Sequence, residues 1–175
     1  MFDLSRSHNK FDVADPRQRA WIEVEPYAIE SNTRILRSLL LDSCLLMAVV
    51  KADGYGHGAE TVARAALRGG ADNLGVATLQ EGLELRQAGL NCPILVLGNL
   101  IQIQELQACF RWNLFPTISS LREALLCQQI AEECGLEFRV HVKVDTGMTR
   151  LGCDFNEAIM LVDAISDMQN VILEG

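Results

Sequence analysis

The sequence predicts an α/β fold in which parallel strands alternate with helices around one core. Short apolar runs recur along the chain, helical patterns separate them, and no linker, low-complexity tract or charge block interrupts the alternation. Strands that are apolar throughout are typical of parallel sheets with both faces covered. Two architectures satisfy this pattern: a doubly wound open sheet, and a partial (β/α)8 TIM-type barrel with about six βα units.

The alternation begins after a polar lead-in. Residues 1–19 show no hydrophobic periodicity, and we expect a flexible segment there. Residues 20–24 (AWIEV) predict a short strand, and residues 26–42 predict a helix with a proline in its first turn. Residues 45–50 (LLMAVV) predict a buried strand, and residues 58–70 predict a helix that ends at two glycines.

The middle of the chain repeats this unit. Residues 73–77 predict a strand, and residues 78–89 predict a helix that starts at a capping box formed by Thr78 and Glu81. Residues 93–98 predict the next strand. Because each strand is followed at once by a helix, these residues predict consecutive βα units.

The last units are less regular. Residues 101–110 predict a weaker helix, and residues 113–118 predict a strand in which Pro116 cannot donate a ladder hydrogen bond. Residues 119–135 predict a helix that is capped by Ser119 or Ser120 and ends at Gly135. The chain then continues with a strand, a helix and a final strand, over residues 138–147, 155–168 and 170–175.

Periodicity alone does not distinguish the two architectures. A doubly wound nucleotide-binding sheet places G-x-G-x-x-G after its first strand, whereas the glycines here stand at positions 54, 56 and 58. This spacing weighs against the doubly wound sheet without excluding it.

Composition narrows the class of protein. The net charge is −8 and the basic residues are scattered, which argues against nucleic acid or an anionic membrane as a partner. No apolar run is long enough to span a bilayer, and the N-terminus lacks the apolar core of a signal peptide. Six widely spaced cysteines without a CxxC pair predict reduced thiols in a cytoplasmic protein. Three histidines without ligand spacing predict no metal site.

Lys51 is the first candidate for chemistry. It stands at the carboxyl end of the apolar run 45–50, where α/β folds place active sites. Burial beside apolar residues lowers the pKa of an ammonium group, and a neutral amine attacks a carbonyl carbon. The glycines that follow let the backbone approach a ligand closely, and Tyr55 lies within reach of the same ligand. Taken alone, a lysine that extends from a strand end into solvent accounts for the same residues.

Two stretches resemble a known family. AVVKADGYGHG (residues 48–58) resembles the pyridoxal 5′-phosphate (PLP) attachment motif of alanine racemases, and HVKVDTGMTRLG (residues 141–152) resembles the segment after the fifth barrel strand in that family. Two lesser stretches, residues 74–89 and 93–98, are also similar. The resemblance covers roughly residues 20–175 and implies the barrel.

The resemblance also implies residue roles. Lys51 would form an imine with PLP and act as the base on the D-alanine face, with Tyr55 beside the cofactor. Arg150 would contact the phenolic oxygen of PLP and lie next to the substrate carboxylate, and Lys143 would be carbamylated and brace Arg150. Without the resemblance, Arg150 is explained by an ordinary ion pair, and Lys143 by a pair with Asp145 on one face of a strand. The implied reaction is the interconversion of L- and D-alanine, which supplies D-alanine for bacterial peptidoglycan.

This chain departs from the family pattern in length. Family members are longer homodimers with shared sites, in which a tyrosine from the partner subunit is the opposite base. Tyr27 and Tyr55 do not match that tyrosine, and the last barrel strands and the β domain would follow Gly175. We therefore expect the N-terminal portion of an alanine racemase, inactive alone.

Two other functions stay open. One is a non-catalytic PLP-binding or homeostasis barrel, although that family lacks ADGYGHG. The other is a cofactor-free α/β domain in which Lys51 is incidental.

Overall fold

Six parallel strands form one sheet in the computed structural model, which describes residues 20–175. The lead-in expected at residues 1–19 lies outside the described residues. The strands pair in chain order: β1 (Met47–Val49), β2 (Asn73–Val76), β3 (Ile94–Asn99), β4 (Phe115–Ile118), β5 (Phe138–Val142) and β6 (Val171–Leu173). A doubly wound sheet reverses direction at a switch point, whereas this order advances one strand at a time. The partial barrel is therefore confirmed.

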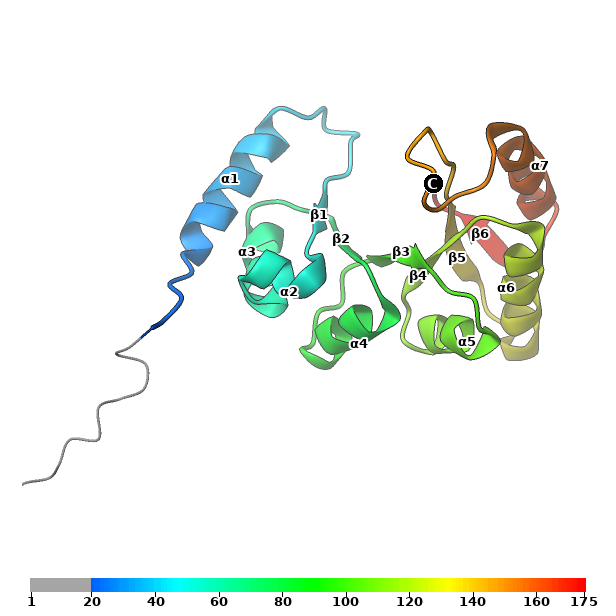
Figure 1. The fold of residues 1–175 in the computed structure, drawn as a ribbon, viewed down its shortest axis with the longest axis horizontal. Helices are drawn as coiled ribbons and strands as arrows, with labels where there is room; N and C mark the ends of the chain where they lie inside the picture. Colours follow the sequence, from blue (N-terminus) through cyan, green and yellow to red (C-terminus); the bar gives the residue numbers. More distant parts are fainter. Residues whose placement is uncertain (1–19) are drawn as a thin grey trace, which may run out of the picture.

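Helices separate the strands and lie along the outer side of the curved sheet (Figure 1). In the described part they are α1 (Pro26–Ser38), α2 (Lys51–Gly56), α3 (Ala59–Arg68), α4 (Leu79–Gln87), α5 (Ile103–Arg111), α6 (Leu121–Cys134) and α7 (Phe155–Ser166). Helix α1 packs on α3, where Glu30 accepts from Arg68 at 2.9 Å. The open row of strands leaves β1 and β6 at its two ends (Figure 1).

The helix ends follow the sequence signals. Thr78 and Glu81 form the predicted capping box of α4. Ser120, rather than Ser119, caps α6, and Gly135 ends it in the left-handed conformation with φ of 65°. These signals are reliable because each involves backbone groups within one turn.

The core lies between the sheet and its helices. Its fully buried side chains include Leu74, Val76, Ile94, Val96 and Val140 from the strands and Leu85, Leu106 and Ile165 from the helices. All six cysteines lie in the described part and are free. Burial raises the pKa of Cys109 and of Cys127 to about 12, so both thiols stay protonated. Among residues 20–175, no helix has both the length and the apolar character that crossing a bilayer requires.

Three strand predictions were wrong in extent or kind. Residues 20–24 form no strand: no described strand pairs with them, and the Ile22 side chain is 79% exposed. Strand β1 is half-exposed rather than buried, because it pairs on one side only and Val49 is 40% exposed. Strand β5 ends at Val142 instead of residue 147, because Val144 leaves the sheet to bridge Cys153.

Pro116 lies in a central strand. Strand β4 pairs with both β3 and β5, and the β3–β4 register shifts between Val96 and Asn99. The hydroxyl of Thr117 donates to the carbonyl oxygen of Val96 at this irregularity. A side-chain donor therefore supports the ladder beside a residue that has no N–H.

Candidate functional site

Lys51 follows strand β1 at the carboxyl edge of the sheet, as predicted. The buried Val50 before it donates its N–H to the carbonyl of Gly75 on β2 at 2.8 Å. The Ala52 N–H after it donates to the Glu81 carboxylate at 2.7 Å. The Lys51 side chain is half-buried and points to a cavity at this edge. The backbone is therefore fixed on both sides of the lysine.

The segment after Lys51, which belongs to the element labelled α2, is a left-handed helical turn. Ala52, Asp53, Gly54 and Tyr55 have φ between 51° and 61°. Left-handed residues other than glycine are unfavourable, so such a turn needs support from its surroundings. Gly54 donates to Val50 at 2.9 Å, and the Asp53 carboxylate accepts from Ala59 at 2.8 Å. The sequence predicted glycine-rich turns but not this conformation.

Tyr55 and His57 project from this turn. The Tyr55 side chain is 60% exposed, and its ring centroid lies 6.0 Å from Lys51 Nζ. His57 Nδ1 lies 3.1 Å from the carbonyl oxygens of Gly54 and Tyr55, and donates to them when it is protonated. His57 is therefore bound to the backbone of the turn.

Lys143 and Arg150 come from the segment after β5. The Lys143 N–H donates to Ile118 at 2.8 Å, so Lys143 is anchored beside β4. Asp145 does not pair with Lys143 in the described part of the chain; its carboxylate accepts from the backbone of Thr149 and Gly147, at 2.9 Å each. These backbone hydrogen bonds lower the pKa of Asp145. Asp145 thus organises the loop that carries Arg150.

The three cationic residues converge on one cavity. It has a volume of about 280 Å3, and its lining consists of Lys51, Ala77, Leu97, Gly98, Lys143, Arg150 and Leu151. No ion pair of the described residues involves these three cations. An amine beside a guanidinium and a second amine suits a ligand with a carbonyl carbon and anionic oxygens. Tyr55 is not in the lining, although it lies near Lys51.

Sequence reasoning missed the apolar part of this lining. Gly98 ends the run 93–98, and a Cβ at this position would overlap the carbonyl oxygen of Ala77. The ends of β2 and β3 therefore approach closely at the cavity. A glycine that directly follows an apolar strand was the available signal.

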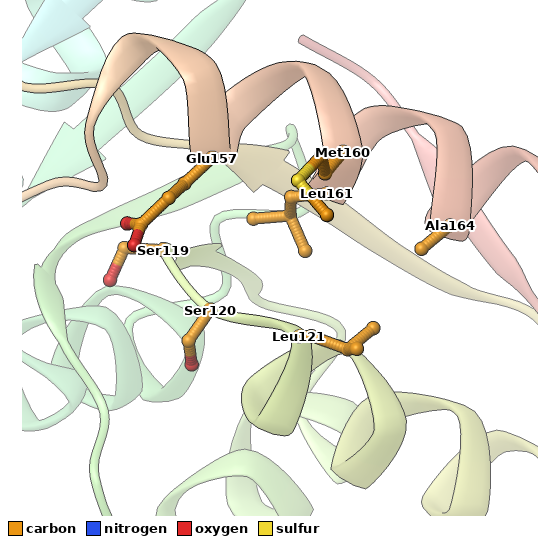
Figure 2. Close-up of a pocket in the computed structure, with 7 residues that line it drawn as sticks. All are labelled: Ser119, Ser120, Leu121, Glu157, Met160, Leu161 and Ala164. Atoms are coloured by element: carbon orange, nitrogen blue, oxygen red, sulfur yellow. The ribbon is translucent and has the colours of Figure 1, made fainter.

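A larger cavity lies elsewhere. It has a volume of about 410 Å3 between the start of α6 and helix α7, and Figure 2 shows Leu121, Met160 and Leu161 around it. Its lining holds one ionisable side chain, Glu157, and none of the four candidate site residues Lys51, Tyr55, Lys143 and Arg150. The smaller cavity is therefore the candidate site.

His141 is a half-buried residue of β5, and burial lowers its pKa while Glu174 partly opposes that effect. Within residues 20–175 no group of His, Cys, Asp and Glu side chains is arranged to hold a metal ion.

Comparison with known proteins agrees with this geometry. Residues 24–175 match the family model described as alanine racemase, N-terminal domain. An alanine racemase of Prochlorococcus marinus is 67% identical over 161 residues, which are 92% of this chain and 42% of that protein. One of Synechocystis is 45% identical over 157 residues, 90% of this chain and 42% of that protein.

A solved structure of an alanine racemase is also similar to this chain. The crystal structure of alanine racemase from E. faecalis superposes with a TM-score of 0.80 at 36% identity, over 87% of this chain and 41% of that one. The chain thus spans about two fifths of the length of the relatives it matches. Fold, site geometry and sequence together show that the chain belongs to the alanine racemase family, whose N-terminal domain it contains.

Proposed function

We propose that this chain binds PLP through Lys51 and contributes the N-terminal half of an alanine racemase site. The observation that carries the proposal is the convergence of Lys51, Lys143 and Arg150 on one cavity at the carboxyl edge of the sheet. Barrel enzymes place their catalytic residues at this edge. Family membership supports the reaction class.

The residues present fit PLP. Lys51 Nζ offers a primary amine to an aldehyde, to which it attaches with loss of one water. Arg150 offers a guanidinium to an anionic oxygen of the cofactor or to the carboxylate of an amino acid. When bound, PLP supplies an electron sink that acidifies the α-carbon of an attached amino acid.

Lys51 and Arg150 have separate tasks in the proposed reaction. Lys51 Nζ, when not attached to the cofactor, takes or returns the α-proton on one face of the substrate. Arg150 holds anionic groups so that this proton lies toward Lys51. Lys143 braces Arg150, and we propose that the Lys143 amine adds carbon dioxide and releases a proton. The resulting carbamate is negatively charged, so repulsion between Lys143 and Arg150 becomes attraction.

The opposite face of the substrate needs a second base. The cavity lining contains no histidine, tyrosine or carboxylate. We propose that this base comes from the partner subunit of a homodimer, and that the protein works in the cytoplasm, in keeping with its six free thiols. The 175-residue chain alone is then expected to bind PLP without racemising alanine.

Covalent attachment tests the cofactor site. The chain contains three lysines, at positions 10, 51 and 143, so borohydride trapping and peptide mass analysis can locate the label. We expect the label at Lys51 and its loss in both Lys51→Ala and Lys51→Arg. A label spread over all three lysines, or none, would contradict the proposal.

A chimera tests the reaction. This chain is joined to the remaining part of the Prochlorococcus marinus relative, and conversion of L- to D-alanine is measured. We expect turnover in the chimera and none with Lys51→Ala. A folded, PLP-labelled chimera without turnover would favour a non-catalytic PLP carrier instead. Turnover by the 175-residue chain alone would refute the proposal that the second base lies outside this chain.

A further inference from the structure

Glu81, on helix α4, reaches the backbone beside Lys51. One carboxylate oxygen, Oε2, accepts the N–H groups of Ala77 and Thr78 at 2.6 and 3.1 Å, as a capping glutamate does. The other oxygen, Oε1, accepts the Ala52 N–H at 2.7 Å, across 29 positions of sequence. One side chain therefore joins the start of α4, the end of β2 and the lysine turn.

The equivalent glutamate of α6, Glu123, makes no such link to any residue in the described range 20–175. Glu123 Oε2 accepts the N–H groups of Ser119 and Ser120 at 2.6 and 3.1 Å, and Ser120 Oγ accepts the Glu123 N–H. These contacts all lie within one turn of the chain. Glu81 and Glu123 thus cap their helices alike, and only Glu81 also holds the peptide that follows a reactive lysine.

The Ala52 N–H is an important group to hold. Ala52 is the first residue of the left-handed turn, with φ of 51°, a conformation that an alanine does not prefer. On the other side of Lys51, the ladder already fixes Val50 to Gly75. The bond to Glu81 therefore fixes the backbone on the other side of Lys51, where the chain leaves the strand.

A neutral amide cannot replace this carboxylate fully. Glutamine has one acceptor oxygen, which keeps two of the three accepted hydrogen bonds when it lies at the cap, so in Glu81→Gln the amide NH2 faces the Ala52 N–H and that bond is lost. We propose that Glu81 is a positioning residue for Lys51, one that aims the amine into the cavity through the Ala52 amide. This inference rests on the proposed function of Lys51 in cofactor attachment.

Hydrogen exchange tests the link without any cofactor. Exchange of residues 50–58 is compared in the wild-type chain, Glu81→Gln, Glu123→Gln and Thr78→Ala; the last removes the Thr78 hydroxyl from the capping box but leaves Glu81 in place. We expect Glu81→Gln alone to speed exchange of the Ala52 amide, by about tenfold or more, as the loss of a hydrogen bond to a charged group allows. Unchanged exchange, or an equal effect of Thr78→Ala, would overturn the inference.

The rate of PLP attachment to Lys51 tests the consequence. We expect Glu81→Gln to slow borohydride-trapped labelling by about tenfold, because a displaced amine meets the aldehyde in poorer geometry. Glu123→Gln and Thr78→Ala should label at the wild-type rate. If Glu81→Gln labels as fast as wild type, Glu81 does not position Lys51. If the wild-type chain takes no label at all, the proposed function fails, while the exchange data still decide whether Glu81 holds the turn.

Discussion

Gly54 connects the lysine turn to helix α3. Its φ is 61°, and a Cβ built there would lie 2.7 Å from Val62 Cγ2 on α3. The positive φ therefore favours glycine, and the close packing against Val62 requires it. Gly56, two residues on, has φ of 84° but no atom within 4 Å of such a Cβ. Alanine at Gly56 would introduce backbone strain alone, whereas alanine at Gly54 would introduce both strain and a steric clash.

Gly54→Ala should destabilise the chain more than Gly56→Ala. We expect Gly54→Ala to lower the free energy of unfolding by roughly 2–4 kcal/mol, since strain and overpacking add. Gly56→Ala carries the strain alone, roughly 1 kcal/mol. Urea denaturation followed by circular dichroism measures both.

Relieving the contact should separate the two contributions. Combined with Val62→Ala, the penalty of Gly54→Ala should fall toward that of Gly56→Ala, because the clashing methyl group is gone. Equal losses at the two glycines would show that packing against α3 is unimportant.

Single residues also show what the sequence can predict. The place of Lys51 follows from the apolar run before it, because a strand end is a local pattern. The left-handed turn does not follow, since Ala52 and Tyr55 carry no bias toward positive φ and the modest bias of Asp53 predicts single residues rather than a turn of four. The second contact of Glu81 was also unpredictable, because the capping box explains the residue fully and its partner lies 29 positions away.

Whole helices and strands show the same contrast between local contacts, which the sequence predicts, and distant contacts, which it does not. The caps of α4 and α6 were predicted correctly because their hydrogen bonds lie within one turn. The strand expected at residues 20–24 requires a partner strand, and no pattern within five residues reveals whether one exists. Strand β5 was predicted too long because residues 143–147 alternate like a strand while Asp145 folds them into a loop.

Strand β4 offers a test at this scale. Thr117 is buried, and its hydroxyl donates to the Val96 carbonyl where the β3–β4 register shifts beside Pro116. Thr117→Val keeps the shape but removes the donor. We expect a loss of about 1–3 kcal/mol in the free energy of unfolding, the cost of a buried acceptor without its partner.

Thr33 on α1 is the matched control. Its hydroxyl donates at 2.8 Å to Ile29, whose carbonyl also accepts a backbone N–H in the helix. Thr33→Val should therefore cost less than about 1 kcal/mol. Similar losses for the two variants in urea denaturation would show that the Thr117 hydroxyl does not support β4.

At the scale of the whole molecule, the site depends on the complete sheet. Lys51 follows β1, Gly98 ends the apolar run of β3, and Lys143 and Arg150 follow β5. Residues 99 positions apart in sequence meet only when β1 through β5 have paired. Loss of β1, the edge strand that Lys51 follows, would therefore open the cavity even if every local turn survived.

The surface of the described part bears on how the 175-residue chain behaves alone. Strands β1 and β6 each pair on one side only, and an unpaired strand edge is a template for association. Large apolar side chains are also exposed on α1, directly after it and on α7, among them Ile35, Leu39 (76% exposed) and Met160 (72% exposed). Together these features favour contact between copies.

We therefore expect the isolated chain to associate as its concentration rises. Sedimentation velocity over a concentration series should show growing species, and a hydrophobic dye should bind to the exposed apolar side chains. Replacing Ile35 and Leu39 with lysine should reduce both signals without lowering the free energy of unfolding, because these side chains are exposed. A monomer at all concentrations that binds no dye would contradict this. If the lysine variant still associates, the contact between copies is made by the unpaired strand edges, through backbone groups rather than side chains.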